Sequence, residues 1–215
     1  MKNVIFFTHA EKGSSGGGKC IYRYSKIINQ IKNFSSEVLH IKKKRTSKYK
    51  NSLNKILNLK KEITSGWQYK DITCAKNFRY KWFENKINLK QNFDFDNRKD
   101  FIILPEIFAH LASELLIKKK IEYGIFIQNG YSINSTNNDD KLKKAYKNAK
   151  FILSISKDTT NCIKLKFPKL KTKILKVSHS LNLGEVNFNK KKNLITYMNR
   201  KLPNHSNLVT SYLKP

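Results

Sequence analysis

The chain has 215 residues, of which 39% are hydrophobic, and a formal net charge of +29 from 44 Lys+Arg against 15 Asp+Glu. This length and hydrophobic content exclude a disordered tail and suffice for one substantial core, or for one domain and the start of another. The three cysteines are far apart and no histidine stands at ligand spacing, which argues against a disulfide framework and a zinc site and indicates a cytosolic protein.

The first secondary-structure elements follow directly from the N-terminus. Residues 4–8 form a short apolar run that is typical of a buried strand, and residues 19–34 carry apolar side chains at the spacing of one helical face. A second strand is predicted over residues 37–42. A strand, a glycine turn, a helix and a further strand in this order are the opening of a parallel α/β sheet.

The same alternation resumes after residue 99 and predicts a doubly wound, Rossmann-like α/β sheet. In chain order the predicted elements are a strand (100–105), a helix (107–117), a strand (123–131), a helix (140–148), a strand (151–156), a helix (157–166) and a strand (172–179).

Residues 42–99 are less regular. Residues 49–63 predict a basic amphipathic helix, which is suited either to lie on a membrane surface or to pack on the sheet with its lysine face in solvent. Five aromatic residues follow, and we interpret them as core or groove lining rather than a stacking platform for nucleic acid; they are Trp67, Tyr69, Tyr80, Trp82 and Phe83.

The high positive charge raises nucleic acid or an anionic membrane surface as a partner. The excess is almost entirely lysine and comes with abundant asparagine and isoleucine, and all three have A/T-rich codons. We therefore interpret much of the charge as coding bias, spread over the solvated faces of every segment. No nucleic-acid-binding motif accompanies it, so nucleic acid is the less favoured partner.

The apolar stretches at residues 4–7 and 101–117 are too short or too interrupted for a signal sequence or a membrane span, and any membrane contact is expected to be peripheral.

The segment GSSGGGKC, residues 13–20, resembles the phosphate-loop pattern G-x-x-x-x-G-K-[ST] except at its last position. Cys20 stands where a serine or threonine hydroxyl would bind Mg²⁺, and no later strand ends in a suitable aspartate. The dinucleotide fingerprint also fails, because Ile21 replaces its third glycine. Two interpretations remain: a turn that brings an anion to the helix N-terminus near Gly18, or a turn that serves chain geometry alone.

Four later segments occur in a fixed order over most of the chain, and together they resemble a group of bacterial glycosyltransferases of the GT-B architecture (family 4-like). These segments are DFIILPEI, YGIFIQNGY, AKFILSISKDTTNCIKLKFP and NLITYMNRK. The resemblance implies two Rossmann-like domains across a cleft: an acceptor-binding domain at residues 1–185, and at 186–215 a linker with the first strand and helix of an incomplete donor-binding domain. It implies metal-independent transfer of a sugar from a nucleotide-sugar to a glycan or lipid-linked acceptor at the cytoplasmic side of a membrane. We expect the 215-residue chain alone to be inactive.

The resemblance also assigns donor-binding residues. Gly16, Gly17 and Gly18 would lie near the donor sugar and its diphosphate. Arg200 and Lys201 match the Arg-Lys of the family's MPRK segment, where cations neutralise the departing nucleoside diphosphate, although Asn199 replaces the proline of that segment (sequence MNRK). No metal or other cofactor is expected.

The predicted acceptor or cleft residues lie where sheet strands end, which is where open α/β sheets bind ligands. They are Glu106, Gln128, Asn129 and Tyr131. Glu106 is equally suited to ordinary helix-start chemistry after Pro105, and Gln128 and Asn129 to a simple turn. His9 also ends a strand and is a candidate acid/base or sugar contact, although the sequence pattern offers it no partner.

Two further points concern alternatives. Glu106 and Glu114 have the E-x7-E spacing that retaining GT-B enzymes carry in their second domain, but here both fall in the first domain, and we interpret the match as accidental. The competing functions are a basic nucleic-acid-binding protein and, ranked last, a phosphate-loop nucleotide-binding protein that depends on Lys19.

Overall fold

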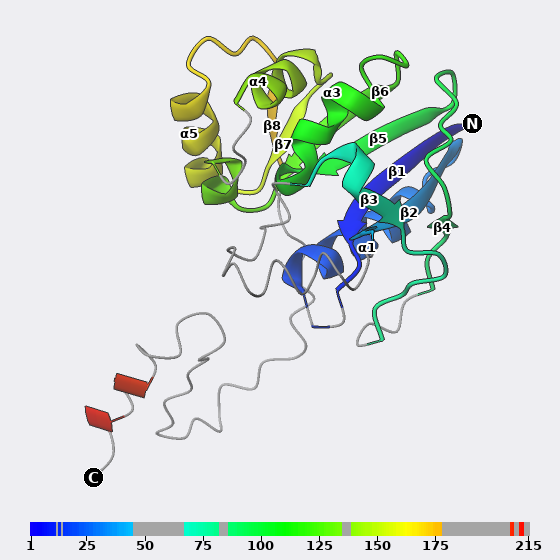
Figure 1. Ribbon diagram of the computed structural model, residues 1–215, viewed down its shortest axis with the longest axis horizontal. Coiled ribbons are helices and arrows are strands. Elements are labelled where there is room, and N and C mark those ends of the chain that lie inside the picture. The colour runs from blue at the N-terminus through cyan, green and yellow to red at the C-terminus, as the bar shows by residue number, and fades with distance from the viewer. Residues whose placement is uncertain are drawn as a thin grey trace, which may run out of the picture. The chain divides into compact units, whose positions relative to one another are not determined.

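The computed structural model describes residues 1–11, 13, 15–44, 67–81, 86–134, 139–177, 207–208 and 211–212. The chain divides into two compact units, Met1–His179 and Ser180–Pro215. The first is an α/β unit with a mostly parallel central sheet flanked by helices, as predicted (Figure 1). In the second, the predicted strand at 193–198 lies outside the described residues, and the four described residues are helical. None of the helices among the described residues is long and apolar enough to cross a membrane.

The sheet has eight strands, of which seven follow the order β3-β2-β1-β5-β6-β7-β8, while β4 pairs with β2. All pairs are parallel except β2 with β3. The strands are β1 (Lys2–His9), β2 (Phe34–Lys43), β3 (Ile72–Cys74), β4 (Leu89–Lys90), β5 (Asp100–Pro105), β6 (Glu122–Ile127), β7 (Ile152–Ser154) and β8 (Ile174–Lys176).

The direction in which successive strands are added to the sheet reverses at β1. The chain first runs outward from β1 to β2, and it later returns to place β5 on the other side of β1, so that Ile5 lies between Glu37 and Ile102. Such a reversal is a topological switch point, where the loops after the two strands diverge to opposite faces and leave a crevice.

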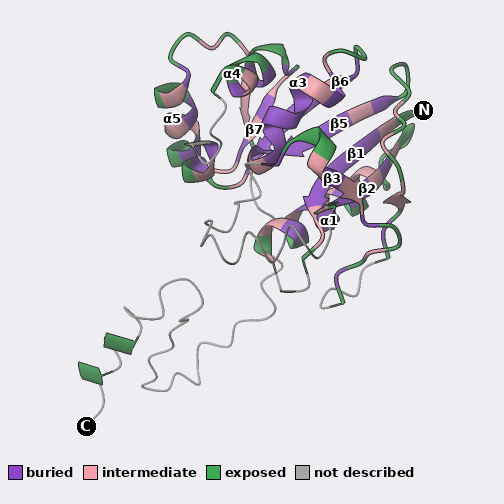
Figure 2. Cartoon of the chain, viewed as in Figure 1, coloured by how far each residue is buried: buried purple, intermediate pink, exposed green. Residues whose placement is uncertain are grey.

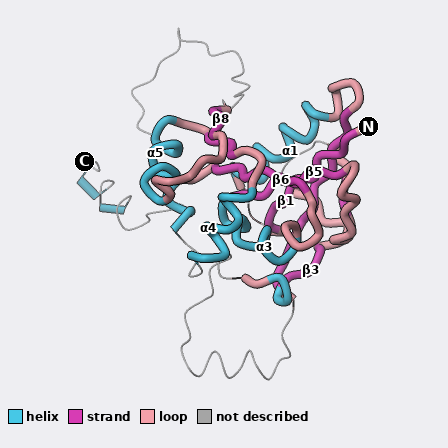
Figure 3. The backbone as a smooth tube through the Cα atoms, turned by 90° about the horizontal axis from the view of Figure 1, so that it is seen from above, coloured by secondary structure: helices cyan, strands magenta, loops and turns pink. Residues whose placement is uncertain are grey.

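The helices cover the two faces unequally. They are α1 (Gly16–Ile28), α3 (Ala112–Leu115), α4 (Asp139–Asn148) and α5 (Lys157–Lys166), with the 3₁₀-helices η2 (Tyr69–Asp71), η3 (Glu106–Leu111) and η4 (Gly130–Asn134). Seen from above, α1 lies on one side of the strands, and α3 and α4 lie on the other (Figure 3).

Each face of the sheet has its own apolar core, and β1, β5 and β6, which lie between the two cores, are mostly buried (Figure 2). On the α3–α5 face, which we call the closed face, the core includes Leu104, Phe108 and Leu142, all 0% exposed. On the α1 face, which we call the open face, β5 to β8 border an apolar groove of about 440 Å³, lined among others by Tyr24 and Leu153.

Several boundaries differ from the predictions. The first helix begins at Gly16 and not near Gly18, because the side chain of Ser15 caps it, and it ends at Ile28 and not at residue 34. The predicted helix 107–117 is 3₁₀ over Glu106–Leu111 and α-helical only over Ala112–Leu115, and most of its side chains are buried between the sheet and its neighbours. The strand predicted to reach residue 131 ends at Ile127.

Candidate functional site

The candidate site lies at the carboxyl edge of the sheet, beside the switch point. β1 ends at His9, β5 at Pro105 and β6 at Ile127. These strands are parallel neighbours, so their carboxyl ends lie at the same edge. The predicted residues from the first unit therefore gather in one region, which helix α1 enters with its N-terminus.

The glycines belong to the first turn of α1, so the expectation of a glycine turn ahead of the helix was wrong. Ser15 has extended backbone angles (φ −134°, ψ 118°), and its hydroxyl accepts a hydrogen bond from the N–H of Gly18 at 3.3 Å. The first N–H groups of an α-helix have no acceptor within the helix and carry its positive dipole end. This turn therefore presents N–H groups at the edge of the sheet, and these groups can donate hydrogen bonds to an anion.

Close packing requires one of the three glycines. A Cβ on Gly18 would lie 2.5 Å from the buried ring of Tyr80. A Cβ on Gly17 would lie 2.5 Å from Oε1 of Gln128, which is the far end of a flexible side chain, and Gly16 has nothing within 4 Å of that position. The role of Gly18 is thus to let Tyr80 approach the backbone of α1.

Tyr80 ties the end of β1 to α1. Its hydroxyl donates to the carbonyl of His9 at 2.7 Å and lies 3.1 Å from the hydroxyl of Thr8. Its ring packs 5.0 Å from that of Tyr22, which lies on α1. Burial raises the pKa of Tyr80 to about 12, so the hydroxyl stays a neutral donor at physiological pH. Tyr80 lies in the core, and it fixes the backbone on which His9 stands.

His9 has a carboxylate partner that the sequence analysis missed. Its Nδ1 lies 2.6 Å from Oε1 of Glu11, and its ring meets Trp67 edge-on at a centroid distance of 5.0 Å and Phe108 at 6.5 Å. The His9 side chain is 22% exposed. The available signal was the i, i+2 spacing at a strand end, which places two side chains on the same side of an extended chain.

Glu106 is buried and turned toward the loop after β6. It is 7% exposed, and its two carboxylate oxygens accept the backbone N–H groups of Gln128 and Asn129, each at 3.1 Å. Burial raises its pKa to about 7, against the opposing effect of these hydrogen bonds. The sequence left two interpretations of Glu106, a cleft contact and helix-start chemistry. Neither describes these two hydrogen bonds, through which the carboxylate holds the β6 loop in place.

Gln128 crosses the crevice, whereas its neighbours form a turn. The amide Nε2 of Gln128 donates to the carbonyl of Gly17 at 3.4 Å. Oδ1 of Asn129 accepts the N–H of Tyr131 at 3.1 Å, a local turn bond, and the Tyr131 side chain is 75% exposed. Gln128 is therefore the residue of this group that reaches the glycine-bearing helix.

Arg200 and Lys201 lie outside the described residues, and so does the helix predicted at 49–63. Glu114 accepts the N–H of Tyr69 and pairs with Lys141, so the two glutamates of the E-x7-E match have different structural partners.

Cys20 and the acidic residues offer no evident metal site. Burial raises the pKa of the Cys20 thiol to about 11, which disfavours the thiolate that metals bind. Within the part of the chain that the structure describes, no group of three His, Cys, Asp or Glu side chains is placed to hold a metal ion.

No model of a known protein family matches the chain, and no curated protein has a significantly similar sequence.

Proposed function

We propose that this chain forms the acceptor-binding half of a GT-B-type glycosyltransferase, which transfers a sugar from a nucleotide-sugar to a hydroxyl of a glycan or lipid-linked acceptor. The observation that carries the proposal is the His9–Glu11 pair at the carboxyl end of β1, at the same edge of the sheet as the N-terminal turn of α1. The reaction requires a proton acceptor for the hydroxyl of the acceptor and N–H groups for the anionic leaving group. Both kinds of group lie at this edge of the sheet.

His9 would receive the proton of the acceptor hydroxyl. With Glu11 accepting a hydrogen bond from Nδ1–H, the other ring nitrogen, Nε2, is left as the proton acceptor. The hydroxyl oxygen then forms a bond to the anomeric carbon as the bond from that carbon to the diphosphate breaks. The contacts of His9 with Trp67 and Phe108 hold the ring in position during this step.

The leaving nucleoside diphosphate develops negative charge, which has to be met by cations or N–H groups. The first turn of α1 supplies N–H groups at the positive end of its dipole. In this proposal Arg200 and Lys201 supply the cationic side chains, as the resemblance to the MPRK segment implies.

Gln128 is the proposed contact for a sugar hydroxyl. Within the part of the chain that the structure describes, its side chain makes one hydrogen bond, the long one of 3.4 Å to the Gly17 carbonyl, and a carboxamide both donates and accepts. Glu106 would hold it indirectly, through the backbone of the β6 loop.

Amide NMR of the purified chain tests this proposal. We expect nucleotide-sugars and nucleoside diphosphates to shift the amide signals of Gly16 to Gly18 without added Mg²⁺, and a glycan acceptor to shift Gln128. His9→Ala should weaken acceptor binding and leave nucleoside diphosphate binding unchanged, because His9 is assigned only to the acceptor. Glu11→Gln is the matched control that keeps the ring and changes its partner.

Two results would contradict the proposal. One is the absence of any shift at these amides with the nucleotide-sugars. The other is Mg²⁺-dependent ATP binding that Lys19→Ala abolishes, which would support a phosphate-loop protein instead.

A further inference from the structure

The positive charge is uneven along the chain, which corrects the expectation that it is spread over every segment. Residues 141–177 contain twelve lysines, no arginine and a single acidic residue, Asp158, for a net charge of +11. Residues 89–140 contain six basic and eight acidic residues, for a net charge of −2. Coding bias acts on both stretches alike, so it does not explain the contrast.

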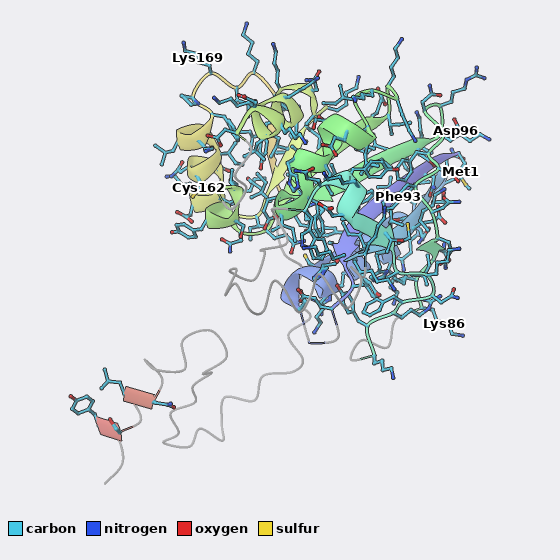
Figure 4. All side chains as sticks on the ribbon, viewed as in Figure 1. Met1, Lys86, Phe93, Asp96, Cys162 and Lys169 are labelled. Atoms are coloured by element: carbon cyan, nitrogen blue, oxygen red, sulfur yellow. The ribbon has the colours of Figure 1, made fainter. Side chains whose placement is uncertain are left out.

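The lysine-rich stretch forms one end of the sheet. It contains most of α4 and all of β7, α5 and β8, which lie together in Figure 1. Lys169, from this stretch, and Asp96, from the acidic one, lie on opposite sides of the view in Figure 4. The two stretches also meet, because Lys141, Lys150 and Lys166 pair with Glu114, Glu122 and Asp139 of the acidic stretch. Lys143, Lys147, Lys169 and Lys171 take no part in these three pairs.

A cavity of about 600 Å³ opens between the ends of α4 and α5. Five lysines line it, with Phe167 and Leu170 among its apolar residues, and none of the described residues that line it is acidic. The lysines are Lys143, Lys147, Lys166, Lys169 and Lys171. We call these five side chains, with Leu165, the lysine surface.

Helix capping explains only part of this arrangement. Cations near a helix C-terminus interact favourably with its dipole, and the effect falls off within the last turn. Lys147 lies in the last turn of α4 and Lys166 in the last turn of α5. Lys143 lies earlier in α4, and Lys169 and Lys171 lie beyond α5, so these three exposed side chains have no such role.

An exposed leucine accompanies the lysines. Leu165 is 83% exposed and lies on α5 between Lys164 and Lys166. An apolar side chain among lysines suits the boundary between lipid headgroups and acyl chains, where the lysines meet phosphates and the leucine enters the apolar layer.

We propose that the lysine surface binds an anionic lipid bilayer. A nucleic acid is the less suitable partner for two reasons. Bidentate contacts to phosphate use arginine, and arginine also contributes to base stacking, but this stretch contains no arginine. In addition, Leu165 would contribute nothing to the binding of a nucleic acid. This surface is distinct from the helix predicted at 49–63, and the proposal does not depend on glycosyl transfer.

Vesicle sedimentation of the full chain tests the proposal. Vesicles of phosphatidylcholine with an equal part of phosphatidylglycerol should bind the chain, pure phosphatidylcholine should not, and added salt should weaken binding. The triple variant Lys143→Gln, Lys169→Gln, Lys171→Gln should lower the partition coefficient about 100-fold, since each lysine near an anionic surface contributes about a fivefold gain.

The matched control is the triple variant Lys118→Gln, Lys119→Gln, Lys120→Gln. These three lysines are exposed just before β6, and the control removes the same charge from the acidic stretch. It should keep most of the binding. Leu165→Gln should weaken binding severalfold, and thermal unfolding should show that all variants are folded.

Three outcomes would overturn the proposal. The first is an equal loss of binding in both triple variants, which would indicate net charge alone. The second is that the chain fails to sediment with anionic vesicles at low salt. The third is tighter binding to a polynucleotide of equal phosphate concentration, with no effect of Leu165→Gln in either assay.

Discussion

The two faces of the sheet are built from the same strands but are covered differently. On the closed face, η3, α3, α4 and α5 bury their apolar side chains against the strands, and Leu104, Phe108 and Ile163 are fully buried. On the open face, of the described helices only α1 packs on the strands, and the groove along β5 to β8 remains. Parallel sheets are usually covered on both faces, so the stability of this unit should depend mainly on the closed face. Four predictions test that difference.

The largest effect is expected from a matched pair of strand leucines. Leu104 on β5 faces the closed side and is 0% exposed, whereas Leu153 on β7 lines the groove. Leu104→Ala should lower the free energy of unfolding by about 2–5 kcal/mol, and Leu153→Ala by about 1 kcal/mol, because a partly exposed leucine loses less burial. Urea denaturation measures both, and equal losses would contradict the comparison.

Two buried groups, one on each face, have pKa shifts with opposite effects on stability between pH 4 and 7. On the open face, burial, with Arg79 adding to it, lowers the pKa of His40 from 6.5 to about 4. Between these values the unfolded chain binds the proton more strongly, so stability falls as the pH falls. On the closed side, burial raises the pKa of Glu106 from 4.5 to about 7, so its contribution falls as the pH rises over that range.

In the wild-type chain the contributions of His40 and Glu106 oppose each other between pH 4.5 and 6.5, and single variants should reveal the slopes. Glu106→Gln should lose about 3 kcal/mol through His40 as the pH is lowered from 6.5 to 4, and His110, whose pKa burial also lowers, adds to this loss. His40→Gln should lose about as much as the pH is raised from 4.5 to 7, through Glu106. Urea denaturation at several pH values measures these slopes, and a variant with an unchanged profile would show that its group does not titrate as described.

The contact between Gly18 and Tyr80 is the tightest packing that we describe on the open face. Gly18→Ala should cost about 1–3 kcal/mol, because the added carbon meets the Tyr80 ring. Gly16→Ala is the matched control in the same turn, and it should be neutral or stabilise by about 0.5–1 kcal/mol, because its position is open and helical. Thermal unfolding separates the two, and equal effects would contradict the packing argument.

The smallest effect concerns the bond from Tyr80 to the His9 carbonyl. Tyr80→Phe keeps the ring against Gly18 and removes the hydrogen bonds to the His9 carbonyl and the Thr8 hydroxyl, at a cost of about 1–2 kcal/mol. In the amide NMR assay the same variant should shift the signals of His9 and its neighbours. Tyr123→Phe, which removes a hydroxyl bonded to the carbonyl of Ala145 on the closed face, serves as the control and should leave them in place.

The order of the elements could be predicted from the sequence because their signals are local. The helix at 157–166 has its Ser156 cap, with a hydroxyl that accepts the N–H of Thr159, and β5 ends at Pro105, which cannot continue the ladder. The start of α1 was misplaced because glycine has a low helix propensity, and the cap on Ser15 overrides it.

The details of the site depend on contacts between distant residues, which a local pattern does not contain. Gly17 is fixed by Gln128, Gly18 by Tyr80, and Glu106 by the backbone of the β6 loop. The sequence indicated that strand ends carry the site, but not which of these side chains hold the framework and which remain available. Glu11 is the exception, because its spacing from His9 was a local signal.

The central position of β1 has a consequence for folding. β1 pairs on one side with β2 and on the other with β5, where Asn3 lies opposite Asp100. β1 leaves the ribosome before β5, so one of its edges stays unpaired until β5 has been synthesised. Such long-range parallel pairing folds slowly and leaves strand edges open to association with other chains. Chaperone dependence during synthesis should therefore centre on the first hundred or so residues.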